Sequence, residues 1–141
     1  MLENGEEGHI VNTASMAGLL TAANPYNVSK HGVVCITEGI YKEFKAMDAK
    51  LSASVLCPGL INTAILDAER NRPSDIGELT DVSALRPEIQ EWSAGFEATL
   101  KAGIEPSEVA DLVFDSIRDD KFYIFPAQEG VLESVRIGTE D

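Results

Sequence analysis

The sequence predicts an α/β fold built on a parallel sheet, and three observations support this. Short β-favouring runs are separated by long segments with helical spacing of apolar residues. The 141 residues are 44% hydrophobic and 25% charged, which suffices for one packed core. No uncharged apolar run is long enough to span a bilayer, and the acidic start does not resemble a secretory signal. We therefore expect a soluble, cytoplasmic α/β protein.

The first predicted strand runs from Gly8 to Ser15 and is mostly β-favouring. Asn24 and Pro25 then provide an N-cap and a first-turn proline for a helix over residues 26–47. Its predicted core face is one helical stripe of apolar residues: Val33, Ile36, Ile40 and Phe44. Other sides also carry apolar or small residues, which indicates further packing: Val34, Tyr41, Gly32 and Gly39.

The rest of the chain alternates in the same way. A second strand over Leu51–Cys57 stops at Pro58 and Gly59, and residues 64–86 lack periodicity and predict an irregular excursion. An amphipathic helix follows Pro87, with its stripe at Ile89, Trp92, Phe96 and Leu100 and a stop at Gly103. Ser107 is the predicted cap of another helix, and Phe122–Phe125 is the last strand.

Charge and cysteine content exclude several function classes. The net charge of −13 would repel nucleic acid phosphates and anionic lipid headgroups, so neither partner is expected. Cys35 and Cys57 have apolar surroundings and no Cys or His at ligand spacing, which predicts reduced, buried thiols and no metal site. His9 and His31 also lack partners at ligand spacing, so we expect them to pack or to face solvent.

Tyr26 and Lys30 are four residues apart, so a phenol and an ammonium share one helical face. The same spacing recurs at Tyr41 and Lys45, and spacing alone does not distinguish the two pairs. Only the first pair lies beside a helix start and shortly after Ser15, a serine at a strand end. At an effective dielectric of about 20, an ammonium about 4 Å away stabilises a phenolate by about 4 kcal/mol. The sequence therefore favours Tyr26 and Lys30 as the functional pair.

Three ordered motifs resemble those of the short-chain dehydrogenase/reductase family: Asn12-Thr13-Ala14-Ser15-Met16-Ala17-Gly18, Tyr26-x-x-x-Lys30, and Pro58-Gly59-Leu60-Ile61-Asn62-Thr63. The resemblance implies a doubly wound, Rossmann-like parallel sheet. It also implies that Ser15 hydrogen-bonds the substrate oxygen and that Tyr26 is the general acid/base. Lys30 would hold the nicotinamide ribose and assist proton transfer by Tyr26.

The resemblance further implies cofactor contacts in the third motif. The turn at Pro58 and Gly59 would lie beside the nicotinamide ring. Ile61 would offer its backbone to the carboxamide, and Thr63 would support the carboxamide or a phosphate. The implied cofactor is NAD or NADP, and the implied substrates are small alcohols and carbonyls.

The family's glycine-rich phosphate turn has no counterpart, because no two of the 11 glycines are two residues apart. By resemblance the 141 residues correspond to a single partial domain, the carboxy-terminal, catalytic half of the fold with about three strands. The family's contact that separates NAD from NADP has no counterpart either. Two interpretations stay open: half of an oxidoreductase, or a non-catalytic α/β fragment or interaction subunit that cannot hold cofactor alone.

Residues 64–104 correspond by resemblance to the family's substrate lid. Trp92 and Phe96 would then line an apolar substrate pocket, and core packing is the equally weighted alternative for this stripe. We also expect a homo-oligomer formed through helix 26–47, because residues normally covered by the rest of the fold or by a second subunit would otherwise face water.

Overall fold

A computed structural model describes residues 1–77 and 86–126 of the chain. The chain forms two compact units, one of Met1–Gly59 with Ser107–Asp141 and the other of Leu60–Pro106. Residues 78–85 of the predicted lid and the acidic residues beyond position 126 lie outside the described residues.

The first unit contains a three-stranded parallel sheet in the order β1-β2-β3, as predicted. The strands are β1 (Gly8–Thr13), β2 (Leu51–Leu56) and β3 (Tyr123–Ile124). Their register is continuous, with the aligned pairs Gly8↔Leu51, Thr13↔Leu56 and Val55↔Tyr123. Since all three strands are parallel, their carboxyl ends share one edge, and Ser15 and Pro58 both follow strands at that edge.

Helix α1 (Pro25–Ala46) begins as the sequence predicts. The Asn24 side-chain oxygen accepts a 2.9 Å hydrogen bond from the Asn27 N–H, and Pro25 occupies the first turn. The helix ends before Asp48, whose φ of 49° is left-handed, a conformation that Asp tolerates better than most residues.

The buried face of α1 differs from the predicted one. The described residues bury Val34, Thr37 and Phe44, whereas Ile36 is 63% exposed. Cys35, expected to be buried, is exposed as well. The helix carries apolar residues on two sides, and packing against β2 decides which side is covered.

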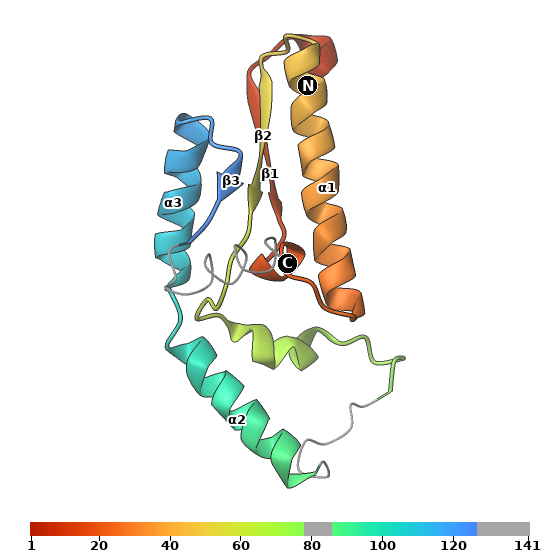
Figure 1. Cartoon of the computed structure of the whole chain (residues 1–141), viewed down its shortest axis with the longest axis vertical. Helices are drawn as coiled ribbons and strands as arrows, with labels where there is room; N and C mark the ends of the chain where they lie inside the picture. The colour runs from red at the N-terminus through yellow and green to blue at the C-terminus, as the bar shows by residue number, and fades with distance from the viewer. Residues whose placement is uncertain (78–85, 127–141) are drawn as a thin grey trace. The chain divides into compact units, whose positions relative to one another are not determined.

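Helix α3 (Pro106–Arg118) starts one residue before Ser107, so the predicted cap residue lies within the first turn. Figure 1 shows α1 and α3 on opposite sides of the strands. The core between α1 and the sheet combines residues of α1, of β2 and its carboxyl end, and of the segment after β1: Ala14, Met16, Val34, Val55 and Cys57. The helices cover the sides of the sheet, and the predicted site residues lie at the carboxyl ends of the strands.

The second unit contains the 3₁₀ helix η3 (Ala64–Asn71) and helix α2 (Pro87–Lys101). The predicted irregular segment over residues 64–86 includes η3, whose 3₁₀ turns need no 3.6-residue periodicity and are interrupted by a kink at Asp67. The Arg70 guanidinium donates to the carbonyl oxygens of Ala64 and Asp67, which stabilises this turn. Gly103 follows α2 because a side chain there would meet the Leu60 carbonyl oxygen at 2.4 Å.

Candidate active site

Ser15 lies just beyond the carboxyl end of β1 and begins the 3₁₀ helix η2 (Met16–Gly18). Its Oγ accepts a hydrogen bond from the Ala17 N–H at 3.2 Å and donates to the Pro58 carbonyl oxygen at 3.4 Å. The Met16 N–H donates to the same carbonyl at 2.9 Å. These bonds bring the predicted serine and the predicted Pro58–Gly59 turn together.

Tyr26 and Lys30 occupy successive turns at the start of α1. Tyr26 is 54% exposed, so the residue is open to solvent. The Lys30 ammonium lies 5.8 Å from the centroid of the Tyr26 ring. It also donates a 3.2 Å hydrogen bond to the Thr13 carbonyl oxygen at the end of β1. Lys30 therefore connects the tyrosine to the strand that carries Ser15.

A close contact between η2 and α1 supports this arrangement. A Cβ atom at Gly18 would lie 2.7 Å from the Lys30 carbonyl oxygen and 3.2 Å from the Val34 side chain. Only glycine permits that approach. Asn27 forms a second connection, which sequence reasoning missed. The sequence held one indication of this role: Asn27 is a polar residue in the first turn of a helix that Asn24 already caps.

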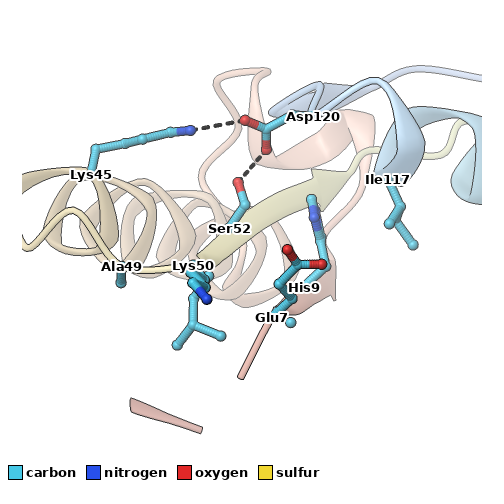
Figure 2. A pocket seen from close by; sticks show the side chains of 10 residues that line it. Glu7, His9, Lys45, Ala49, Lys50, Ser52, Ile117 and Asp120 are labelled. Atoms are coloured by element: carbon cyan, nitrogen blue, oxygen red, sulfur yellow. Dashed lines mark hydrogen bonds and ion pairs between the residues drawn. The ribbon is translucent and has the colours of Figure 1, made fainter. Parts of the chain in front are cut away.

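The second Tyr-x-x-x-Lys pair has a different role. The Lys45 ammonium forms a 2.8 Å ion pair with Asp120, and Ser52 also donates to that carboxylate. Figure 2 shows these side chains converging at the amino ends of β1 and β2, opposite the edge that carries Ser15. The two bonds lower the pKa of Asp120. The Tyr41 ring packs on Phe122 at 5.0 Å, so this pair is structural.

A pocket of about 660 Å³ lies at this end of the sheet, and His9 lines it together with Lys45, Ser52 and Asp120. The His9 Nε2 lies 2.6 Å from the Ser54 Oγ, and Ser54 donates its own proton to the Lys121 carbonyl at 2.6 Å. Nε2 must therefore be the donor, which fixes the tautomer of the neutral ring. Burial lowers the pKa of His9; Asp120 opposes this shift and Lys45 adds to it.

The remaining predicted site residues divide between the two units. Pro58 and Gly59 belong to the first unit and are half-buried. In the second unit Ile61 forms an isolated bridge with Ile104, while Thr63 is exposed. Trp92 is 70% exposed and stacks on Phe96 at 5.5 Å, so core packing within this unit does not account for Trp92.

Neither a metal centre nor a membrane-spanning helix occurs within residues 1–77 and 86–126. No group of three or more potential ligands there is arranged to hold a metal ion. Nor does this part of the chain include a helix with the length and apolar character needed to cross a membrane.

Comparison with known proteins identifies the family of the chain. A family model described as short chain dehydrogenase matches residues 1–74, and the chain belongs to that family. The predicted family and the Rossmann-like α/β fold are thereby confirmed. Two curated relatives in the family are named as a dehydrogenase/reductase and a dehydrogenase.

Three relatives show the extent of the match. The CLA biosynthesis dehydrogenase/reductase of Lactiplantibacillus plantarum is 28% identical over 92% of this chain and 46% of its own length. The C alpha-dehydrogenase of Sphingobium sp. is also 28% identical, over 92% of this chain and 41% of its own. A short chain dehydrogenase/reductase from Burkholderia phymatum, solved in complex with NAD, superposes with a TM-score of 0.83 at 35% identity. The match covers 100% of this chain and 50% of the Burkholderia phymatum chain. This chain therefore spans about half the length of the relatives that it matches.

Proposed function

We propose that this chain is the catalytic half of an NAD- or NADP-dependent oxidoreductase that interconverts an alcohol and a carbonyl. The observation that carries the proposal is Lys30, whose ammonium bonds the end of the Ser15 strand and lies over the Tyr26 ring. Membership of the short-chain dehydrogenase family and the NAD complex of the Burkholderia phymatum relative support it.

Each residue of the trio contributes a different group. In alcohol oxidation the Tyr26 oxygen accepts the substrate's hydroxyl proton, and in carbonyl reduction the Tyr26 hydroxyl returns it. The Ser15 hydroxyl donates to the substrate oxygen, which carries increasing negative charge as a carbonyl is reduced. For this it must exchange its 3.4 Å bond to the Pro58 carbonyl for one to substrate. The Lys30 ammonium supplies positive charge beside the Tyr26 ring.

The residues present fit the nicotinamide side of a dinucleotide. Among the described residues, Lys30 donates one hydrogen bond, to Thr13, which leaves two N–H groups of the ammonium for ribose hydroxyls. The Pro58–Gly59 turn, Ile61 and Thr63 are the proposed contacts to the ring and its carboxamide. A bound nicotinamide would supply or accept the hydride. The 141 residues contain no G-x-G turn to receive the phosphates.

Tyr26→Phe tests the proposal in a chain completed with an amino-terminal half of this family. Turnover should fall by at least about 100-fold, because the phenol transfers the proton, while cofactor affinity stays within about twofold. Lys30→Ala should reduce both turnover and cofactor affinity. Steady-state kinetics and fluorescence titration with NADH and NADPH measure the two effects.

The second Tyr-x-x-x-Lys pair provides a matched control. Tyr41→Phe and Lys45→Ala alter the same residue types on the same helix, at the opposite end of the sheet, and should leave turnover within about twofold. Retained carbonyl reduction by the Tyr26→Phe variant would show that the assignment of Tyr26 is wrong.

The missing glycine pair favours a second candidate function, a non-catalytic α/β interaction subunit. Calorimetric titration of residues 1–141 with NADH and NADPH bears on how much of the cofactor site this half carries. We expect no tight binding by the isolated chain, and a micromolar dissociation constant would contradict that. Gain of binding on completion with an amino-terminal half supports the enzyme, and lack of it supports the interaction subunit.

We also propose that the protein forms a homo-oligomer through α1. The outer side of this helix exposes Val28 and Ile36, at 68% and 63%. Gly32 and Gly39 lie on the same helix and have open space in front of them, which allows close approach of a second helix. The exposed, stacked pair of Trp92 and Phe96 remains the predicted apolar surface for substrate.

A further inference from the structure

Asn27 immediately follows Tyr26, and its side chain bonds a different segment of the chain. The residue is 8% exposed. Its Nδ2 donates to the carbonyl oxygens of Ala17 and Leu20, at 2.9 and 3.0 Å. Both protons of the amide are therefore used by the segment between Ser15 and α1, and no other side chain of similar size offers two such donors from one nitrogen except Gln.

The backbone of Asn27 is held equally firmly. Its N–H donates to the Asn24 side chain at 2.9 Å, and its carbonyl oxygen accepts from the His31 Nδ1 at 3.0 Å. Because a carbonyl oxygen only accepts, His31 must carry its proton on Nδ1 for this bond. Asn27 is thus a fixed point within the first turn of α1.

Ala17 completes a short path from Asn27 to the candidate serine. The Ala17 carbonyl accepts from the Asn27 amide, and the Ala17 N–H donates to the Ser15 Oγ at 3.2 Å. Ala17 alone therefore links the Ser15 hydroxyl to Asn27, the residue that follows Tyr26. Close packing of Gly18 on the Lys30 carbonyl brings the same segment against α1.

We propose that Asn27 is a positioning residue that sets the place of the Ser15 hydroxyl relative to the Tyr26 phenol. The inference rests on the proposed function, and it adds a residue that touches neither substrate nor cofactor. A displacement of about 1 Å between reacting groups can cost about 100-fold in rate. Loss of the two Asn27 bonds frees the 15–20 segment to shift by such an amount, while the Lys30 contact to Thr13 stays in place.

Asn27→Ala and Asn27→Asp test the inference in the completed enzyme. For both variants kcat should fall tenfold or more, and the dissociation constant of the cofactor should stay within twofold. The Asp carboxylate faces two carbonyl oxygens, and only its protonated form can donate to one of them. The ratio of kcat for Asn27→Asp to kcat for the parent should therefore rise as the pH is lowered, a dependence that Asn27→Ala lacks.

Thr37→Val is the matched control for a loss of stability. Thr37 is also a buried polar residue of α1 and lies ten residues beyond Asn27. Its hydroxyl accepts a hydrogen bond from the Asn12 amide at 3.0 Å and donates to the Val33 carbonyl oxygen. Its replacement breaks a bond between β1 and α1 without touching the Ser15 segment, so kcat should stay within twofold. Asn27→Ser keeps one donor and is the variant to compare if Asn27→Ala does not fold; its kcat should then lie below that of the parent and of Thr37→Val.

Equal kcat values for Thr37→Val and the folded Asn27 variants would overturn the inference. So would a pH-independent kcat ratio for Asn27→Asp. Failure of the underlying function gives a different result, because Tyr26→Phe would then retain turnover. Loss of turnover in Tyr26→Phe with full kcat in Asn27→Ala overturns the positioning role alone.

Discussion

Lys30 and Lys45 illustrate how one residue type acquires two functions on one helix. Each lies four residues after a tyrosine, with its ammonium over the ring, at 5.8 and 5.1 Å from the centroid. Lys30 bonds the end of β1, where Ser15 follows. Lys45 pairs with Asp120 at the surface, where an ion pair adds little to stability because solvent screens it. The two pairs share residue types and spacing, and the groups that Lys30 and Lys45 bond give the two pairs different roles.

The two cysteines should differ in reactivity in the folded chain. Burial raises the pKa of Cys57 to about 11, and the thiolate is the reactive form, whereas Cys35 is exposed. With a disulfide reagent at pH 8 we expect one thiol to react quickly and the other only after unfolding in urea. Cys35→Ser should abolish the fast phase. Two thiols of equal rate in the native chain would contradict this prediction.

At the scale of elements, the two edges of the sheet differ in what they hold. The carboxyl ends of the strands lead to Ser15, the proposed substrate-binding serine, and to Pro58, a proposed cofactor contact. The amino ends carry a polar group in which Asp120 binds Lys45 and Ser52, and His9 binds Ser54 (Figure 2). Asp120 lies in the turn after α3 in a left-handed conformation, with φ at 49°. These bonds fasten both helices to the sheet away from the candidate site.

His9 should make the stability of the fold sensitive to mild acid. Its pKa in the folded chain lies below the ordinary 6.5, mainly because burial disfavours the charged ring. The unfolded chain therefore binds more protons near pH 6, and the free energy of unfolding should fall as the pH drops below 6.5. Asp120 acts in the same direction at lower pH, since its pKa is depressed below 3.8.

Urea unfolding between pH 7.5 and 5.5 measures the His9 contribution. His9→Gln removes the titrating ring and keeps a donor for Ser54, so the variant should lose less stability than the parent over this range. An identical pH dependence in the two proteins would mean that His9 does not titrate differently in the folded and unfolded states.

At the scale of the whole molecule, the described sheet has an open edge. Within residues 1–77 and 86–126, β1 pairs with β2 on one side, and its six residues run from Gly8 to Thr13 without a charged side chain or proline. Such an edge invites pairing with another strand. The outer side of α1 adds exposed apolar residues, Val28 and Ile36. Both features favour association.

We expect residues 1–141 to self-associate or to be partly molten, despite the net charge of −13, which opposes association. Sedimentation velocity and near-ultraviolet circular dichroism measure the two states. If association uses α1, Cys35 should react more slowly with the disulfide reagent as the protein concentration rises. A monodisperse monomer with cooperative unfolding would contradict this expectation and favour the interaction subunit.

Much of the fold and the core of the candidate site could be predicted from local pattern. Asn24 and Pro25 predicted the start of α1 because capping depends on groups within a few residues. The order of strands and helices predicted the parallel sheet, whose geometry then places Ser15 beside Pro58. Tyr26 and Lys30 share a helical face for the same local reason.

Tertiary structure alone decided which of two apolar sides of α1 is buried, because that depends on the neighbours that cover it. Val34 and Thr37 face the sheet, so Ile36 and Cys35 are left in solvent. The bonds of Asn27 to Ala17 and of Asp120 to Lys45 join residues 10 and 75 positions apart. No local pattern encodes such contacts, since they form only when the chain brings distant backbone and side-chain groups within hydrogen-bond distance.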